Sequence, residues 1–302
     1  MHMDFQGWVS THQARFEGVL QELLPRAEAA PQRLHEAMRY AVLDGGKRVR
    51  PLLALAAGEL TGADVARVNV AAAAVELIHA YSLVHDDMPC MDDDVLRRGK
   101  PTCHVQYGEA TALLVGDSLQ ALAFQLLAEH RLSDDAQRQL DMIKLLAVAA
   151  GSRGMAGGQA IDLAGVGMAL TLPELEFMHI RKTGALIRAA ILLGAQCGPV
   201  PTAQPIPAET LDKLDRFGKL VGLAFQVVDD VLDCEADTAT LGKTAGKDAD
   251  NAKPTYVSLL GIQGARKMAQ QLHREALESL AGFGAAAQRL RELADFIVLR
   301  KF

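Results

Sequence analysis

Two clusters of aspartates are the most distinctive chemical feature of this 302-residue chain. The first runs from Asp86 to Asp92 and the second from Asp229 to Asp233, and both interrupt apolar stretches. On a helix, Asp229 and Asp233 would lie one turn apart, about 6 Å, and would repel by about 2 to 3 kcal/mol at an effective dielectric near 20. A bound cation removes that penalty, and oxygen ligands select a hard ion such as Mg²⁺. The pattern predicts a magnesium enzyme that acts on a phosphorylated substrate.

The first aspartate cluster contains a proline, which limits how the flanking helix can continue. Pro89 lies between Asp86-Asp87 and the aspartates at 92–94. Because proline is poorly tolerated inside a helix, the chain is expected to kink or loop out there, and Asp92 can then face the same side as Asp86. A solvated acidic loop is the alternative interpretation, and the second cluster argues against it.

Two basic segments accompany the acidic ones. Arg97-Arg98-Gly99-Lys100 follows the first cluster directly, and Gly45-Gly46-Lys47-Arg48-Val49-Arg50 lies between two expected helices. Arginine binds phosphate oxygens in bidentate fashion, and glycine lets the backbone approach a ligand closely. Taken singly, either segment could instead neutralise neighbouring acids or form a simple turn. Beside the aspartates, they indicate binding of anionic groups.

The elements that must position these residues are predicted to be helices. Half of the residues are hydrophobic and only 5% are aromatic, which suits close-packed helices better than a β-sandwich. Apolar residues recur at steps of three and four, and the alternation typical of strands is not sustained. Glu76 and His79 are isolated polar residues on an otherwise apolar helix. The expected helices are one that ends at Gly45-Gly46, then 65–85, 109–131, 136–164, 173–197, 209–233, 254–261, 264–281 and 286–299.

The chain is expected to form a single all-α domain over residues 1–302. The proline-rich segment 199–207 is the clearest linker candidate, but the two aspartate clusters lie on opposite sides of it. If both clusters line one ion site, both halves belong to one folding unit. A nucleotide site is not supported, because Gly242-Lys243-Thr244 lacks the first glycine of a P-loop. The glycine-rich segment 151–158 lies within a helical pattern and follows no strand.

Charge and composition argue against several other classes of protein. The net charge is −6 and no basic stripe compensates it, so nucleic acid is not the expected partner. The four cysteines show neither zinc spacing nor a C-x-x-C pair, which indicates reduced thiols. No signal peptide is apparent, and no segment reaches roughly 18 uninterrupted apolar residues. A cytoplasmic protein without a membrane span is therefore expected.

Seven motifs, in order and with matching spacing, resemble those of the trans-isoprenyl diphosphate synthases. The gap from Asp86 to Asp92 is similar to that of the bacterial farnesyl diphosphate synthases in particular, and the resemblance extends over residues 40–255. The motifs are Gly45-Gly46-Lys47-Arg48-Val49-Arg50-Pro51, Glu76-Leu77-Ile78-His79, Asp86-Asp87 with Asp92, Leu96-Arg97-Arg98-Gly99-Lys100-Pro101-Thr102, Gly158-Gln159 with Asp162, Lys182-Thr183-Gly184, and Phe225-Gln226-Val227-Val228-Asp229-Asp230 with Asp233.

The resemblance implies a bundle of roughly ten or more helices around a central cavity, and a Mg²⁺-dependent prenyltransferase. Such enzymes condense isopentenyl diphosphate with dimethylallyl or geranyl diphosphate by ionisation, condensation and elimination, which gives farnesyl diphosphate. A geranyl or geranylgeranyl diphosphate synthase is the nearest alternative. A terpene cyclase has no second diphosphate to bind at Lys47, Arg50 and His79. A non-catalytic synthase subunit would have no use for intact aspartate clusters.

The resemblance also implies roles for individual residues. Three Mg²⁺ ions would be held by Asp86, Asp92 and Asp229, with contacts through water or neighbouring groups from Asp87, Asp230 and Asp233. Positive charge around the allylic diphosphate would come from Arg97, Lys182, Lys243 and Lys253. The isopentenyl diphosphate, which needs no metal, would be held by Gly46, Lys47, Arg50, His79 and Arg98. A satisfied core histidine and a general base are the alternatives for His79.

The remaining expectations concern the hydrocarbon part of the substrate and the assembly. In similar enzymes the allylic cation faces the backbone carbonyls of Lys182 and Thr183 and the side chain of Gln226, in an apolar cavity that Gln159 and Asp162 would also line. Tyr81 and Ser82 lie about one turn, roughly 5.4 Å, before Asp86. An aromatic ring at Tyr81 would limit the product to fifteen carbons, unless Tyr81 is ordinary core. The apolar segment 109–128 is a candidate homodimer interface, although monomer core explains it equally well.

Overall fold

The structure is a computed structural model that describes residues 4–43, 45–198, 206–235 and 254–300, and these are mostly helical. The helices are α1 (Phe5–Leu23), α2 (Gln32–Val42), α3 (Val49–Thr61), α4 (Val65–Asp86), α5 (Cys103–Tyr107), α6 (Glu109–Glu129), α7 (Ala136–Ala150), α8 (Met155–Ala164), α9 (Leu172–His179), the π-helical turn η1 (Ile180–Gly184), α10 (Ala185–Gln196), α11 (Ala208–Glu235), α14 (Tyr256–Ser279), the 3₁₀ turn η2 (Gly284–Ala287) and α15 (Gln288–Val298). A short antiparallel hairpin pairs β1 (Leu96–Arg97) with β2 (Lys100–Pro101). The all-α prediction is confirmed.

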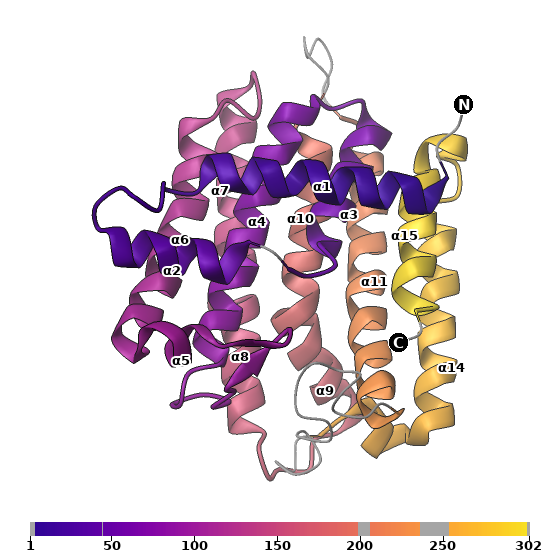
Figure 1. The fold of residues 1–302 in the computed structure, drawn as a ribbon. Coiled ribbons are helices and arrows are strands. Elements are labelled where there is room, and N and C mark those ends of the chain that lie inside the picture. Colours follow the sequence, from indigo (N-terminus) through magenta and orange to yellow (C-terminus); the bar gives the residue numbers. More distant parts are fainter. Residues whose placement is uncertain (1–3, 44, 199–205, 236–253, 301–302) are drawn as a thin grey trace.

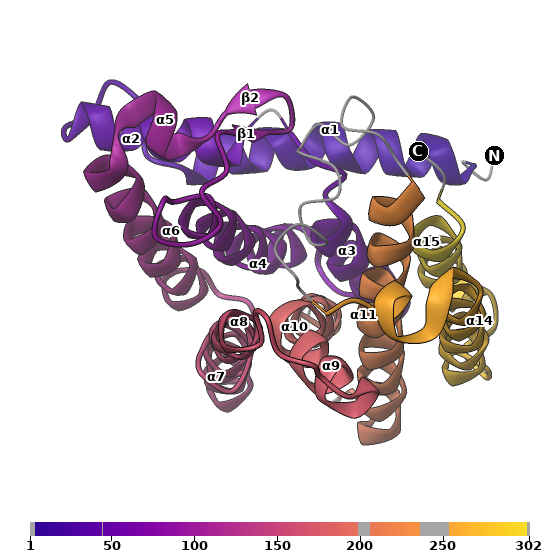
Figure 2. The same cartoon turned by 90° about the horizontal axis from the view of Figure 1, so that it is seen from below.

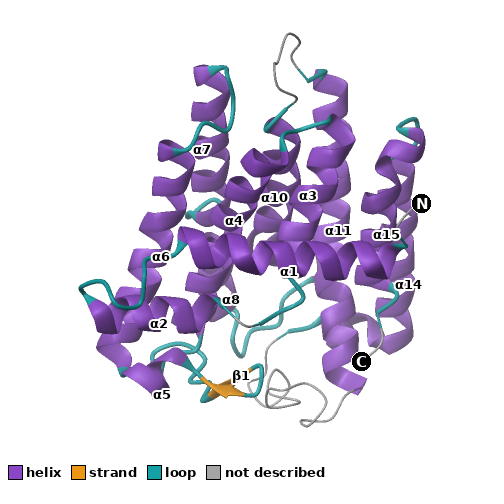
Figure 3. Cartoon of the chain, turned by 45° about the horizontal axis from the view of Figure 1, so that its top comes forward, coloured by secondary structure: helices purple, strands orange, loops and turns teal. Residues whose placement is uncertain are grey.

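The long helices form a bundle that α1 and α2 cross at a steep angle (Figure 1). Viewed along the bundle, α3, α4, α10 and α11 lie in the middle, α6, α7 and α8 on one side, and α14 and α15 on the other (Figure 2). The most extensive packing joins α11 to α14, α4 to α6 and α10 to α3. The hairpin and several loops gather at one end of the bundle (Figure 3).

The centre of the bundle consists largely of small and aliphatic side chains. Ala71, Ala72, Ala73 and Ala74 on α4 are fully buried, and such small residues let neighbouring helices pack closely. A second apolar cluster is formed by α9, α11 and α14. Leu220 packs against both clusters, so the apolar interior is continuous between them.

Local sequence signals explain where several helices begin and end. Asp64 caps α4 by accepting hydrogen bonds from the N–H groups of Ala66 (2.8 Å) and Arg67 (3.2 Å). Thr171 and Glu174 form a capping box at the start of α9. The expected helix over 136–164 is two helices, because the chain leaves helical geometry at Gly151 and returns to it only after Gly154. A Cβ atom at Gly154 would lie 2.1 Å from the Ala149 carbonyl oxygen, so only glycine fits this break.

Two helices are long and apolar enough to cross a membrane, namely α4 and α6. The α4 helix is mostly buried inside the bundle, as a core helix is. The α6 helix exposes Leu113 and Leu114 at its surface. Length and composition alone are weak evidence for a membrane span, and no clear one is evident in the described residues.

Candidate active site

Both aspartate clusters lie at the same end of the bundle. The α4 and α11 helices run in the same direction, and each carries its aspartates near its C-terminal end (Figure 1). After Asp86 the chain turns back on itself around Pro89, and the N–H of Asp92 donates to the carbonyl oxygen of Asp86 at 2.8 Å. The predicted interruption at Pro89 therefore brings Asp92 next to Asp86. We call Asp86, Asp87, Asp92 and Asp229 the acidic wall.

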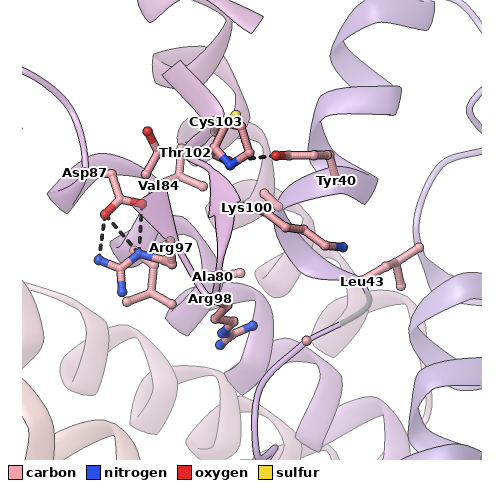
Figure 4. A pocket seen from close by; sticks show the side chains of 14 residues that line it. Tyr40, Leu43, Ala80, Val84, Asp87, Arg97, Arg98, Lys100, Thr102 and Cys103 are labelled. Carbon is pink, nitrogen blue, oxygen red and sulfur yellow. Dashed lines mark hydrogen bonds and ion pairs between the residues drawn. The ribbon is translucent and has the colours of Figure 1, made fainter. Parts of the chain in front are cut away.

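The carboxylates at the end of α4 are disfavoured in their ionised form. Burial raises the pKa of Asp86 to about 6; Lys182 opposes this rise and Asp92 adds to it. Burial also raises the pKa of Asp87, against the effect of its hydrogen bonds to Arg97. Arg97 grips Asp87 with two nitrogens, Nε at 2.8 and 2.9 Å from the two carboxylate oxygens and Nη2 at 2.6 Å from Oδ1. Figure 4 shows this pair, with Arg98 and Lys100 pointing away from it.

The carboxylates on α11 have different partners. Asp229 is paired with Arg300, whose guanidinium also donates to the Phe225 carbonyl oxygen at 3.3 Å. Asp230 is buried, and its oxygens accept hydrogen bonds from Gln226 Nε2 (3.0 Å) and from the Tyr256 N–H (2.8 Å). Asp233 lies one turn further along α11 than Asp229. The sequence did not suggest a position for Arg300, because it lies far from Asp229 along the chain.

A group of basic side chains with lowered pKa values lies beside these carboxylates. We call Lys47, Arg50, His79 and Arg98 the basic wall. Burial lowers the pKa of all four, and the pKa of His79 falls well below its ordinary value because Arg50 and Arg98 add to the effect. The buried Nε of Arg50 has no hydrogen-bond partner among the described residues. An anion bound here would relieve both the mutual repulsion and the unpaired donor.

Glycine brings the loop before α3 against the basic wall. Gly46 has a φ of +87°, and a Cβ atom there would lie 2.6 Å from Arg98 Nη2. A larger residue would therefore both strain the backbone and displace the Arg98 guanidinium. The sequence predicts that Gly45-Gly46 lets the backbone approach a ligand, whereas the contact that the structure shows is with the Arg98 side chain.

Charge interactions connect the two walls with the π-helical turn. Lys47 and Arg50 both interact with Asp229, and Asp86 interacts with Lys182. Lys182 Nζ donates to the buried Asp162, and the Thr183 hydroxyl donates to Gln226 Oε1 at 3.1 Å. The ends of α4 and α11, η1 and the loop before α3 thus contribute to one set of interacting side chains.

The π-helical turn is packed closely on both sides by glycines. A Cβ atom at Gly158 would lie 2.2 Å from the Lys182 backbone nitrogen, and one at Gly222 would lie 2.8 Å from the Gly184 Cα. A π-helical turn is rare and often marks a functional position in a helix. Its extra residue shifts the backbone around Lys182 and Thr183 relative to a regular helix. Nothing in the sequence pattern distinguished this turn from a continuous helix over 173–197.

Tyr81 and Ser82 lie on α4 just before the aspartates. Tyr81 is buried and contacts the His85 ring edge to face, with ring centroids 5.8 Å apart. The Ser82 hydroxyl donates to the His79 carbonyl oxygen at 2.8 Å. Gln159 on α8 is half-buried, and its Nε2 has no partner among the described side chains or backbone. Lys243 and Lys253 lie outside the described residues.

The acidic wall fits a hard divalent cation by its donor chemistry. Within the described ranges no three His, Cys, Asp or Glu side chains gather closely enough to hold an ion by themselves. The carboxylates are instead divided between α4 and α11, so an ion bound here needs further oxygens from an anionic ligand. The raised pKa of Asp86 is the observation that supports this fit, because a nearby cation would relieve the penalty of its ionised form.

The fold and site together define a class of enzyme. An all-α bundle carries, at one end, carboxylates suited to a hard cation beside a group of partly buried and exposed basic side chains suited to an anion. A sequence model of the family described as polyprenyl synthetase matches residues 31–292, and the chain belongs to this family.

Individual relatives agree with this assignment. The farnesyl diphosphate synthase of Haemophilus influenzae is 46% identical over 289 residues, covering 96% of this chain and 93% of that protein. A chloroplastic geranylgeranyl pyrophosphate synthase of Capsicum annuum is 46% identical over 272 residues, covering 89% of this chain and 72% of that protein. The crystal structure of a geranyltransferase from Helicobacter pylori, complexed with magnesium and isoprenyl diphosphate, matches with a TM-score of 0.86 at 33% identity, covering 99% of both chains.

Proposed function

We propose that the protein synthesises farnesyl diphosphate by joining isopentenyl diphosphate head to tail to dimethylallyl or geranyl diphosphate, with Mg²⁺ as cofactor. The observation that carries this proposal is that the acidic wall lies beside the basic wall. The pKa of Asp86 is raised in the first, and the pKa values of all members are lowered in the second. A site for one diphosphate with metal and a second diphosphate without metal requires this arrangement. The farnesyl diphosphate synthases among the relatives support the same activity.

The basic wall is proposed to hold isopentenyl diphosphate. Lys47, Arg50 and Arg98 supply charge, and Gly46 lets the diphosphate approach the backbone. Burial lowers the pKa values of these groups despite the nearby carboxylates, and a bound diphosphate would favour their charged forms. His79 is neutral here and can donate one hydrogen bond.

The acidic wall is proposed to hold the allylic diphosphate together with three Mg²⁺ ions. Asp86, Asp92 and Asp229 would be the ligands, and Asp87 and Asp233 would contribute through water. When bound, Mg²⁺ stabilises the negative charge that develops on the departing diphosphate. Arg97 and Lys182 add fixed positive charge, and Lys243 and Lys253 are proposed to do so as well.

The allylic cation is proposed to be stabilised by backbone carbonyls at η1 and by Gln226. Because Gln226 Nε2 donates to Asp230, its Oε1 is directed toward Thr183. Asp230 thus orients the Gln226 amide, in addition to its proposed contact with metal-bound water. The carbon–oxygen bond of the allylic substrate breaks and a carbon–carbon bond forms to isopentenyl diphosphate. The condensed cation then loses a proton, for which the released diphosphate is the proposed acceptor.

Product length is proposed to be set at Tyr81. This buried ring lies about one turn before Asp86, where a growing chain would run along α4. A geranylgeranyl diphosphate synthase is the second candidate, and the similarity to the Capsicum annuum protein supports it. A smaller residue at Tyr81 should lengthen the product, and a larger one at Ser82 should shorten it.

The test is product sizing with purified protein, Mg²⁺, isopentenyl diphosphate and each allylic starter. We expect farnesyl diphosphate from the wild type, no turnover with EDTA, longer products from Tyr81→Ala and shorter ones from Ser82→Phe. Twenty-carbon product from the wild type would favour the second candidate. Identical products from all three proteins would remove Tyr81 and Ser82 from the length determinants.

We further propose a single-domain, cytoplasmic homodimer. The continuous apolar interior supports one domain, and the exposed Leu113 and Leu114 on the apolar helix α6 support an interface there. Light scattering on a size-exclusion column would measure the mass. Leu113→Asp should convert the dimer to monomer, whereas a wild-type monomer would contradict the assembly.

A further inference from the structure

Arg48 lies in sequence between two members of the basic wall, yet its side chain has a different environment. We infer that Arg48 is a positioning residue, clamped by Glu17 and Glu76, which fixes Lys47 and Arg50 for isopentenyl diphosphate without contacting that substrate itself. This inference rests on the proposed function. The resemblance assigns roles to Lys47 and Arg50, and the structure distinguishes the arginine between them.

The Arg48 guanidinium is hydrogen-bonded to other groups of the protein. Arg48 is only 5% exposed. Its Nη1 donates to Glu76 Oε1 at 2.8 Å, and its Nη2 donates to Glu17 Oε2 at 2.9 Å and to the Val42 carbonyl oxygen at 2.6 Å. One side chain therefore joins α1, the end of α2 and the middle of α4.

The backbone of Arg48 is the point at which the loop becomes α3. Arg48 has a φ of 51° and a ψ of 38°, a left-handed conformation that is unfavourable for a residue other than glycine. Its carbonyl oxygen accepts from the Leu52 N–H at 3.0 Å, in the first turn of α3 that also carries Arg50. The preceding carbonyl, of Lys47, accepts from Gln13 Nε2 at 2.9 Å. The side-chain clamp holds this strained conformation, and with it the directions of Lys47 and Arg50.

The charge of Arg48 also differs from that of its neighbours. Burial and nearby arginines lower the pKa of Arg50 and Arg98, which marks cations without sufficient counter-charge. For Arg48, burial acts in the same direction, but the hydrogen-bonded Glu76 and Glu17 carboxylates outweigh it and raise its pKa. Arg48 is thus already neutralised within the fold. A substrate diphosphate would have to break these ion pairs to bind it.

Removing the charge of Glu76 separates positioning from simple electrostatics. Glu76→Gln makes the surroundings of the basic wall more positive, so attraction alone predicts tighter binding of isopentenyl diphosphate. Loss of the clamp predicts the opposite. We expect the KM for isopentenyl diphosphate to rise roughly tenfold or more in Glu76→Gln and in Arg48→Lys, since misplacement of about 1 Å has effects of this size. The KM for geranyl diphosphate should change less than about threefold, because Arg48 contacts Glu76, Glu17 and Val42 and none of the groups proposed to bind that substrate.

A double variant separates positioning from folding stability. A lone buried charge is strongly destabilising, whereas replacing both partners by apolar groups often restores stability. Arg48→Met with Glu76→Leu keeps the net charge constant and should recover much of the thermal stability lost in Arg48→Met alone. We expect its KM for isopentenyl diphosphate to stay high. Recovery of KM together with stability would overturn the inference.

Metal-free calorimetry gives a readout that does not need turnover. Isopentenyl diphosphate titrated into protein in EDTA should bind wild type and the control Arg67→Lys alike, and Glu76→Gln more weakly. Arg67 is the matched control because it pairs with Asp134 at 2.9 Å near the other end of α4. Tighter binding of isopentenyl diphosphate by Glu76→Gln would overturn the positioning role of Arg48, as would equal rises in the KM for both substrates. Neither result would overturn the proposed function. Absence of binding and condensation by the wild type overturns the proposed function, and the inference with it.

Discussion

The pKa values at the acidic and basic walls are shifted in opposite directions. At the acidic wall, burial and mutual repulsion raise the pKa of Asp86 to about 6. At the basic wall, burial and mutual repulsion lower the pKa of Arg50, Arg98 and His79. At the acidic wall, Arg97 pairs with Asp87, Arg300 pairs with Asp229 and Lys182 interacts with Asp86. The basic wall interacts chiefly with Asp229 and Glu76.

This difference explains why one diphosphate should need metal and the other should not. Carboxylates repel a diphosphate directly, so a cation must lie between them. Guanidinium and ammonium groups attract it without help. The same fold therefore provides two ways to bind a diphosphate, through metal at the acidic wall and directly at the basic wall. Substitutions in one wall at a time test which substrate each wall binds.

The largest expected effect is that of Asp86→Asn. Turnover should fall by about a thousandfold, because a group that anchors charge stabilisation at the leaving diphosphate is lost. The metal-free protein should become more heat-stable at neutral pH, because a disfavoured buried charge is removed. Radiolabel incorporation and differential scanning fluorimetry measure the two effects. Asp141→Asn, at an exposed position on α7, is the control and should change neither. Full activity in Asp86→Asn would remove the acidic wall from the mechanism.

At the basic wall, Arg50→Met should act on one substrate only. The KM for isopentenyl diphosphate should rise about a hundredfold, in line with loss of a charge-assisted contact of about 3 kcal/mol. The KM for geranyl diphosphate should stay nearly constant. Steady-state kinetics with each substrate varied in turn provides the measurement, with exposed Arg216→Met as control. Equal changes for both substrates would contradict the division between the walls.

The pH dependence of stability should have opposite signs for the two walls. Asp86 has its pKa raised to about 6, so the folded protein takes up its proton first and gains stability as pH falls from 7 toward 4. His79 has its pKa lowered, so the unfolded chain takes up its proton first and stability is lost as pH falls through 6.5. Between pH 8 and 5, the melting temperature of Asp86→Asn should therefore decline more than that of the wild type, and that of His79→Gln less. The shifts should amount to a few degrees, and parallel curves for all three proteins would refute them.

The smallest expected effect concerns Arg300, which forms an ion pair with Asp229. Arg300→Met should strengthen binding of Mg²⁺ with inorganic diphosphate by about two- to fivefold, the size of a partly exposed ion pair. Calorimetry at fixed Mg²⁺ would measure it. Arg300→Lys, which keeps the charge, should stay close to the wild type. Weaker binding by Arg300→Met would show that Arg300 assists the ligand rather than competing with the metal.

Much of the fold and part of the site could be predicted from the sequence because the relevant signals are local. Hydrophobic periodicity located most of the helices, and Pro89 indicated the turn that brings Asp92 back to Asp86. Helix breaks such as that at Gly154 were missed, since a glycine inside an apolar pattern does not reveal which backbone it touches.

Other parts of the site depend on contacts between distant segments. The Arg300–Asp229 pair joins residues 71 positions apart, and the clamp on Arg48 combines α1, α2 and α4. A partial signal existed for the clamp: Glu76 is an isolated carboxylate on an apolar helix, and a buried carboxylate requires a partner. The sequence could not show whether the partner of Glu76 is Arg48, Arg50 or Arg98, all of which interact with it.

The contact between Gly158 and the Lys182 backbone has a consequence for how such an enzyme can diversify. Even a methyl group at position 158 would overlap a main-chain nitrogen, so the packing of α8 against η1 does not tolerate a larger residue there unless the backbone moves. Tyr81, on α4, packs against the side chain of His85, and a side chain can be replaced without moving the backbone. New product sizes should therefore arise by changes along α4, while α8 stays constant.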